Sequence, residues 1–474
     1  MKKWMPYLIV LTLLLGGLIV SAFYSPIWYD DAGHFLVARE AARGNGLCYP
    51  LDQTGEHCES DSPFITMGPV LAYPLAGWMA ILGESMLMAR LGMVLLTLIA
   101  VLALVWVGRL LTRPQKAIVA VGLMALNIQF LTYGAEVLGE LPMMGFVLAG
   151  LGCFLAWDRN GGWHWAGLGI LTWCLAIGIK EYAILPLGLS LVFWWLMREV
   201  ARDRPVSVLK LGIFFFLALT LTLTLLHGGP NGLIEYYLGR QSYTSEFFAL
   251  ELGISLKFLL LKPLFWLGTA GMVLKWRVKR RPEEALTLSV QAAWLVFYLF
   301  SAGYDRFGFL LLFLPAIYVA EFVPYIWKSL GRITHWAWLR RTMLVFAGLI
   351  VFGQQTWWVF GKRIVQPETV NAIEWKATWR LEHVKAKVIL TAEQQMTVFL
   401  EEFRLKWRLP SIVPSQGRDC NGFHPDFELA HGELFLAGPY AFTEYQKCID
   451  WGNLTVVDSV TAGEEKWVIY RGKD

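Results

Sequence analysis

Long apolar stretches recur along most of this chain, and they constrain its fold more than any other feature. Of the 474 residues 56% are hydrophobic and only 16% are charged, which is more apolar than a soluble domain tolerates. Stretches of about 17 to 25 apolar residues are long enough to cross a bilayer as helices. The sequence therefore predicts a polytopic α-helical membrane protein with about eleven transmembrane helices, near residues 5–23, 86–108, 117–134, 137–157, 163–179, 182–197, 207–227, 256–274, 286–302, 308–327 and 342–360.

Basic residues fall in short clusters between the apolar stretches and predict the orientation. Lys2 and Lys3 precede the first span, which places the N-terminus in the cytoplasm by the positive-inside rule. With eleven alternating spans, the later clusters within 109–116, 198–204, 275–281 and 328–341 also fall on the cytoplasmic side. The net charge of +4 is distributed in these clusters, so nucleic acid is not an expected partner.

The first stretch has a second interpretation. Lys2-Lys3, the apolar run and Val20-Ser21-Ala22 resemble the three regions of a cleaved signal peptide. Cleavage would leave the orientation of every later segment unchanged.

Two polar regions stand apart from the spans and indicate two domains. The first is an exterior loop, about 24–85, which belongs to a transmembrane domain of residues 1–360. Residues 68–74 in this loop predict short interfacial helices. The second is a soluble region, 361–474, with helix-like residues 368–384 and 392–405 and strand-like residues 387–390 and 467–470. We expect it to form a small α/β domain on the exterior or periplasmic side.

The cysteines fit this topology. Cys48 and Cys58 lie in the first loop, and Cys420 and Cys448 lie in the C-terminal region. Two local disulfides are expected if both regions face an oxidising compartment, whereas free thiols throughout remain the alternative.

Ionisable residues from distant parts of the sequence are expected at the same exterior face. Such groups are costly at the membrane boundary and usually face a cavity, where they pair or bind substrate. The candidates are Asp30, Asp31, His34, Glu136, Glu140, Lys180, Glu181, His227, Asp305 and Arg306.

Each candidate also has a structural interpretation. Asp30 and Asp31 precede Ala-Gly-His-Phe-Leu-Val-Ala, so either carboxylate would serve as a solvated helix N-cap. Glu136 and Glu140 are four residues apart and would share one helical face. Lys180 and Glu181 would form an interfacial pair or, for the lysine, a phosphate contact.

These residues resemble a known family. The segment from Asp30 to Glu40 is similar to the Asp-Glu motif that opens the first exterior loop of polyprenol-phosphate-sugar glycosyltransferases, which include protein O-mannosyltransferases and the lipid A aminoarabinose transferase. Gly68-Pro69, Arg90, Glu140-Leu141-Pro142 and the run from Arg306 to Pro315 fit in the same order. The resemblance covers residues 5–327 and leaves the C-terminal region unexplained.

The resemblance implies an inverting membrane glycosyltransferase of the C-type fold, which uses a sugar linked to undecaprenyl or dolichyl phosphate. Asp30 matches the first acidic position of the motif and is implied to be the catalytic base. The chain departs from the pattern at Asp31, where a longer Glu is usual, and at His34, where an aromatic residue is usual. It has Thr66-Met67-Gly68-Pro69 where some members of the family carry a Lys just before a pair of prolines.

The chemistry suits these residue types. A carboxylate deprotonates the acceptor hydroxyl by general-base catalysis, and cations stabilise the departing phosphate. We expect Asp30 to be the base, Asp31 and His34 to orient the acceptor, and Lys180 and Arg306 to contact the phosphate. Further substrate contacts are expected from Glu136, Glu140, Tyr304 and, as a third cation, Arg240.

The expected partners are the lipid-linked sugar donor, membrane lipids, and an acceptor that is a lipid, a glycan or a protein. The sequence shows no nucleotide-binding glycine loop and no cluster of metal ligands, so it indicates no cofactor and leaves a divalent metal open. The expected location is the plasma or inner membrane. Two alternatives stay open, namely a flippase or transporter of lipid-linked glycan and a glycan polymerase or ligase.

Overall fold

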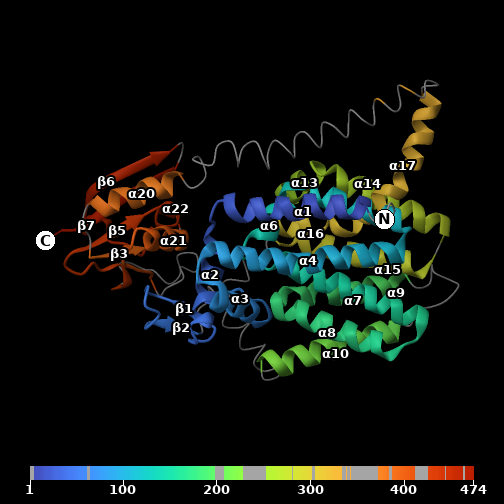
Figure 1. The fold of residues 1–474 in the computed structure, drawn as a ribbon, viewed down its shortest axis with the longest axis horizontal. Helices are drawn as coiled ribbons and strands as arrows, with labels where there is room; N and C mark the ends of the chain where they lie inside the picture. Colours follow the sequence, from blue (N-terminus) through green and yellow to red (C-terminus); the bar gives the residue numbers. More distant parts are fainter. Residues whose placement is uncertain are drawn as a thin grey trace. The chain divides into compact units, whose positions relative to one another are not determined.

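The fold is described from a computed structural model (Figure 1). It covers residues 5–60, 65–197, 208–227, 252–279, 281–301, 305–333, 338, 342, 372–383, 387–410, 425–443, 445–462 and 465–473. The chain divides into two compact units: residues 1–23 with 93–365, and residues 24–92 with 366–474. The division expected from the sequence followed chain order, whereas these contacts group the first loop with the C-terminal residues.

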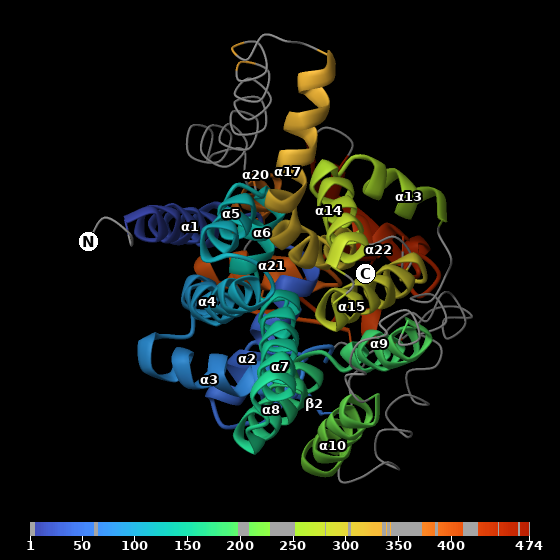
Figure 2. The same cartoon turned by 90° about the vertical axis from the view of Figure 1, so that its right-hand side faces the viewer.

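The first unit is helical, and most of its longer helices run roughly in one direction (Figure 1), so that the second view looks approximately along them, whereas α17 runs across this direction (Figure 2). Its helices are α1 (Met5–Tyr24), α4 (Met86–Leu111), α5 (Pro114–Ala125), α6 (Ile128–Ala135), α7 (Glu140–Asn160), α8 (Trp163–Ile179), α9 (Ile184–Met197), α10 (Val208–His227), α13 (Leu252–Leu260), α14 (Pro263–Lys279), α15 (Pro282–Leu299), α16 (Asp305–Leu310) and α17 (Phe313–Ile333), with a 3-10 turn η1 (Glu181–Ala183). The first residues of α4 and the last residue of α1 belong to the second unit.

Glycines allow some of these helices to approach closely. A Cβ atom at Gly145 of α7 would lie 2.7 Å from the backbone of Ala100 in α4. A Cβ atom at Gly268 of α14 would lie 2.2 Å from the carbonyl oxygen of Pro315 in α17. Small residues at such crossings are typical of helices that pack within a membrane.

Helices occupy every expected span up to residue 327, although three of them are broken, among them the span 308–327, which is interrupted between α16 and α17. The expected span 117–134 bends by 73° between α5 and α6, where the Asn127 side chain accepts hydrogen bonds from the N–H groups of Gln129 and Phe130. The expected span 256–274 is interrupted before Pro263. The expected span 342–360 lies outside the described residues, apart from residue 342.

Three described helices are long and apolar enough to cross a membrane by themselves, within Tyr7–Tyr24, Met86–Leu111 and Glu140–Asn160. The bent pair of α5 and α6 makes a fourth if it counts as one span. Several shorter apolar helices accompany them. The number of eleven spans therefore stays a prediction.

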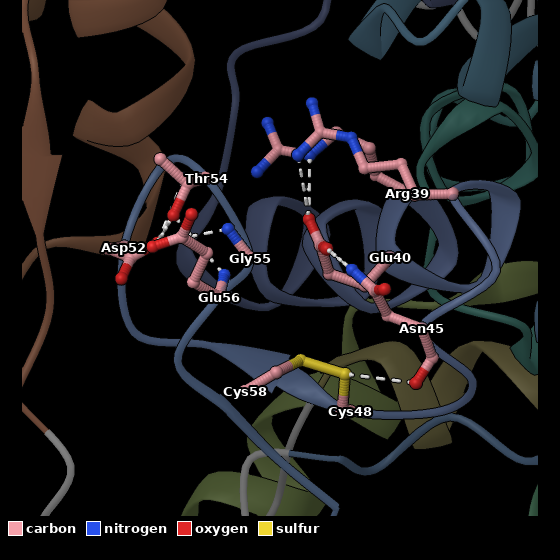
Figure 3. Close-up of a disulfide and its surroundings, with 10 residues drawn as sticks. Arg39, Glu40, Asn45, Cys48, Asp52, Thr54, Gly55, Glu56 and Cys58 are labelled. Carbon is pink, nitrogen blue, oxygen red and sulfur yellow. Dashed lines mark hydrogen bonds and ion pairs between the residues drawn. A yellow bond between two sulfur atoms is a disulfide. The ribbon is translucent and has the colours of Figure 1, made fainter.

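The second unit begins with the segment that follows α1. It contains α2 (Tyr29–Ala42), the short strands β1 (Tyr49–Pro50) and β2 (Cys58–Glu59), and α3 (Pro69–Leu82). A disulfide joins Cys48 to Cys58 beside the antiparallel pair of β1 and β2 (Figure 3). Cys448 is also disulfide-bonded, while Cys420, its expected partner, lies outside the described residues.

The C-terminal part of this unit is a five-stranded sheet with helices. Its elements are α20 (Ala372–His383), β3 (Val388–Thr391), α21 (Gln394–Glu402), β4 (Trp407–Arg408), β5 (Glu433–Ala437), α22 (Pro439–Thr443), β6 (Leu454–Ala462) and β7 (Glu465–Gly472), with 3-10 turns η5 (Pro425–Phe427) and η6 (Trp451–Asn453). The strand order is β4-β3-β5-β7-β6. The pairs β3–β4 and β3–β5 are parallel, and the pairs β5–β7 and β6–β7 are antiparallel.

Alternation along the central strands gives this sheet its core. Leu390 of β3, Phe435 and Ala437 of β5 and Tyr470 of β7 point into one apolar cluster, which Ala441 of α22 completes. This packing fixes α22 on the sheet.

Candidate active site

The two adjacent aspartates lie in the first turn of α2, where they have different surroundings. The helix begins at Tyr29 and its N-cap residue is Trp28, so the expectation that an aspartate is the cap is wrong. Asp31 is fully buried and forms an ion pair with Arg90 of α4, which is itself 3% exposed. Asp30 is partly exposed. Burial and pairing thus commit Asp31 to Arg90, while Asp30 remains partly accessible.

Arg90 also holds the chain that enters α2. Its guanidinium donates hydrogen bonds to the carbonyl oxygens of Ser25, at 2.8 Å, and Pro26, at 2.7 Å. The ion pair with Asp31 therefore connects the start of α2 to the segment before it.

One turn further along α2, His34 lies against the segment that precedes α3. Its Nε2 atom lies 2.6 Å from Oγ1 of Thr66, and the imidazole is 2% exposed. Thr66 belongs to the stretch in which some relatives of the resembled family carry a lysine. A histidine–threonine pair occupies this place in the second unit.

The C-terminal part of the second unit contributes residues to the same turns of α2. The ring of Tyr440 in α22 stacks on Tyr29, with centroids 4.1 Å apart. Gly33 lacks a side chain where Gln394 of α21 lies, since a Cβ atom there would be 2.2 Å from Oε1 of Gln394. Sequence reasoning missed Tyr440 and Gln394 because nothing in the sequence indicates which residues of the tail contact the first loop.

A half-buried ion pair joins the same two parts of the second unit farther along α2. The Arg39 guanidinium donates to both carboxylate oxygens of Glu401 in α21, at 2.7 and 2.9 Å. Its neighbour Glu40 is fully buried and accepts hydrogen bonds from Arg39, Arg43 and Asn45 (Figure 3). Loss of either partner would leave an uncompensated charge on the other, so this pairing ties α2 to α21 within the second unit.

A second cluster of candidate residues lies in the first unit, around Glu140. Glu140 is the first residue of α7 and is 2% exposed. Its Oε1 atom lies 3.9 Å from Nζ of Lys180 and 3.8 Å from Nε of Arg306. Neither carboxylate oxygen has a hydrogen bond within the described part of the chain. Three residues far apart in the sequence therefore form one charged cluster with a net positive charge.

Helix ends bring this cluster together. Lys180 follows the last residue of α8, where the helix dipole favours a cation, and Arg306 lies in the short helix α16. Tyr182 lies in the same region and is stacked on Phe297, with centroids 5.2 Å apart. Its nearness to Lys180 in the sequence is the only signal that indicates Tyr182 before the structure is known.

Glu136 does not share a helical face with Glu140, so that expectation is wrong. Glu136 is the C-cap residue of α6, and α7 begins only after Gly139. Gly139 has φ 88°, a left-handed conformation that glycine adopts without strain, and it allows the turn between the helices. Glu136 is fully buried beside this turn.

The remaining candidates are not placed. Arg240 and Tyr304 lie outside the described residues, as do the side chains of His227 and Asp305. Within the described ranges, no group of three or more His, Cys, Asp or Glu side chains is arranged to hold a metal ion.

The sequence of this chain matches the model of one known protein family. A family model described as dolichyl-phosphate-mannose-protein mannosyltransferase matches residues 61–226. No curated protein sequence matches the chain.

Solved structures match over nearly the whole chain. ArnT from Cupriavidus metallidurans bound to undecaprenyl phosphate has a TM-score of 0.60 at 12% identity, and the match covers 99% of this chain and 98% of that one. The oligosaccharyltransferase of Archaeoglobus fulgidus in the apo form has a TM-score of 0.59 at 12% identity, with 92% and 70% covered. The same archaeon's AglB with an inhibitory peptide and a dolichol-phosphate has a TM-score of 0.57 at 13% identity, with 94% and 71% covered.

These similarities agree with the motifs read from the sequence. The resemblance of this chain to the polyprenol-phosphate-sugar glycosyltransferases is thus confirmed, and the chain is an integral membrane protein with the C-type glycosyltransferase fold.

Proposed function

We propose that this protein is an inverting glycosyltransferase that moves a hexosyl or pentosyl group from a polyprenyl phosphate to an acceptor hydroxyl, with Asp30 as the general base. The observation that carries the proposal is the unequal environment of the two aspartates. Asp31 is buried against Arg90, whereas Asp30, in the same helical turn, is partly exposed. A base must reach the proton that it removes, so accessibility favours Asp30.

The reaction needs two tasks from the protein, the removal of the acceptor proton and the stabilisation of the departing phosphate. Asp30 takes the proton of the acceptor hydroxyl, whose oxygen attacks the anomeric carbon of the sugar. The bond between this carbon and the phosphate oxygen breaks on the opposite side, so the configuration inverts and the lipid phosphate leaves with the bonding electrons. Cations that meet the developing charge on the phosphate lower the barrier to this step.

We assign the phosphate contact to Lys180 and Arg306. Both cations lie within 4 Å of Glu140, so two positive charges are concentrated at one place, and charge-assisted hydrogen bonds from Lys and Arg are a typical means of binding phosphate. The carboxylate of Glu140 would keep the two cations together in the absence of donor, because it offsets their mutual repulsion. Tyr182, Phe297 and Phe307 form an aromatic cluster in the same unit, and such a cluster suits a lipid chain.

The donor class has support from the similar structures. ArnT from Cupriavidus metallidurans is bound to undecaprenyl phosphate, AglB from Archaeoglobus fulgidus is in complex with a dolichol-phosphate, and the matching family model is that of dolichyl-phosphate-mannose-protein mannosyltransferase. The acceptor is a hydroxyl of a lipid, a glycan or a protein. We infer that His34 and Asp31 keep α2 in place while the acceptor lies near Asp30.

We infer that the reaction takes place on the exterior or periplasmic face of the plasma or inner membrane, with eleven spans and with the C-terminal α/β part on the same side. The disulfide between Cys48 and Cys58 supports an oxidising surrounding for the first loop. The basic clusters support a cytoplasmic N-terminus.

The test is to purify the Asp30→Asn variant and assay it with a radiolabelled polyprenyl-phosphate sugar. We expect no sugar transfer or release, because the amide cannot accept the proton, while membrane insertion and yield remain normal. Glu56→Gln is the matched control, since Glu56 is exposed in the same loop and is not among the residues assigned to the reaction. Activity of the Asp30→Asn variant at the control level would exclude Asp30 as the base, and movement of intact lipid without transfer by the wild type would indicate a transporter.

A further inference from the structure

A pocket of about 520 Å³ lies in the first unit, away from Glu140. Its lining includes cationic side chains from the ends of several helices, namely Arg113, Lys116, Arg159, Lys275, Lys279 and Arg281. Only two carboxylates, Glu283 and Glu321, share the lining. The excess of cations indicates an anionic ligand.

Some of the cations are already paired. Lys116 and Lys275 form ion pairs with Glu321, and Arg159 forms an ion pair with Glu283 at 3.0 Å. Lys275 is only 7% exposed, and it also donates a hydrogen bond to the carbonyl oxygen of Leu111. These contacts therefore hold the side chains of Lys116, Arg159 and Lys275 in place in the lining of the pocket.

The other cations remain available for a ligand. Among the residues that the structure describes, no carboxylate forms an ion pair with Arg113, Lys279 or Arg281. Arg113 precedes α5, Lys279 ends α14, and Arg281 precedes α15. Three helix ends thus bring unpaired positive charge to one pocket, a combination that suits a phosphate group.

The position of the pocket separates it from the cluster around Glu140. Helix α7 runs from Glu140 to Asn160 without a break, and Arg159 lies in its last turn. At 1.5 Å per residue the two ends of this helix are about 30 Å apart, which is the thickness of the hydrocarbon core. The pocket therefore belongs to the opposite end of the helices from Glu140.

We propose that this pocket is a second phosphate-binding site, which takes the phosphate of an anionic lipid headgroup or free phosphate at the membrane face opposite Glu140. The basic clusters of the sequence fall at this end, and the cytoplasmic leaflet carries anionic lipids. The site does not depend on the proposed transfer reaction, since none of its residues belongs to the Asp30 or Glu140 clusters.

The test compares two triple variants of the full chain with the same loss of charge. Arg113→Gln, Lys279→Gln and Arg281→Gln remove the unpaired cations of the pocket. The control variant carries Arg109→Gln in α4, Arg277→Gln in α14 and Lys328→Gln in α17. These substitutions remove exposed cations that do not line the pocket. Native mass spectrometry then measures the retention of phosphatidylglycerol, with phosphatidylcholine as the neutral lipid.

We expect the pocket variant to bind phosphatidylglycerol at least about tenfold more weakly than the wild type, and the control variant to match the wild type. A third variant that combines Arg113→Lys, Lys279→Arg and Arg281→Lys should preserve binding, which separates loss of charge from misfolding. Release of the lipid by inorganic phosphate would identify free phosphate as a competing ligand, and retention would identify the headgroup as the preferred one. Equal weakening in both triple variants, or none in either, would overturn the proposal.

Discussion

Glu393 of the second unit has a pKa that depends strongly on the fold. Glu393 lies between β3 and α21 and is fully buried. Burial raises its pKa to about 7, although a hydrogen bond from the N–H of Ala441, at 3.1 Å, favours the charged form. Ala441 lies in α22 beside Tyr440, which stacks on Tyr29 next to Asp30. The protonation of Glu393 therefore affects a helix that contacts the start of α2.

This pKa predicts a dependence of stability on pH. The folded protein holds the proton of Glu393 up to about pH 7, whereas the unfolded chain releases it near pH 4.5. Stability from this group is therefore complete below pH 4.5, falls as the pH rises to 7, and changes by about 3 kcal/mol over that range. We expect the thermal midpoint of the full chain to fall from pH 5 to pH 7.5, and Glu393→Gln to reduce the slope. The exposed Glu428→Gln is the control, and an unchanged slope in Glu393→Gln would contradict the prediction.

The sequence alone indicates candidate residues but not which residues they contact. Asp30 and Asp31 were selected because carboxylates at a membrane boundary are costly. Their different surroundings depend on Arg90, which is 59 residues away from Asp31 in the chain. Glu140, Lys180 and Arg306 were each selected from their own segments, and only the packing of α7, α8 and α16 shows that they meet.

At the scale of elements, helix ends rather than helix bodies carry the charged cluster of the first unit. The apolar periodicity predicted where helices lie, because an apolar stretch of sufficient length has few alternatives in a membrane. It did not predict the break of 73° between α5 and α6. Asn127 was the available signal, since its side chain caps α6.

The position of Arg306 in α16 leads to a prediction about donor binding. Arg306→Ala leaves Glu140 with Lys180 alone and removes one of the two cations assigned to the phosphate. We expect the apparent KM for the lipid-linked donor to rise about tenfold or more, because hydrogen bonds to charged groups contribute about 1.5 to 3 kcal/mol. Steady-state kinetics with the purified protein measures this value, and Arg306→Lys should recover part of the loss. An unchanged donor affinity would exclude Arg306 as the main phosphate contact.

At the scale of the whole molecule, chain order does not describe the organisation of the fold. The sequence suggested a division near residue 360, because the apolar stretches end there. The second unit instead combines residues 24–92 with residues 366–474. The ion pair between Arg39 and Glu401 joins residues 362 positions apart, and a sequence pattern contains no information about such a contact.

The two units also allow a test of orientation. Glu382 is exposed in α20 of the second unit, and Arg277 is exposed in α14 of the first, near the basic pocket. If the basic end of the helices is cytoplasmic and the C-terminal part is exterior, a membrane-impermeant maleimide should label Glu382→Cys on intact cells. It should label Arg277→Cys only after permeabilisation. The parent chain gives the background, since Cys153 and Cys174 are buried and Cys48 and Cys58 form a disulfide. Labelling of both variants from the same side would contradict the proposed topology, and with it the assignment of the Asp30 site to the exterior face.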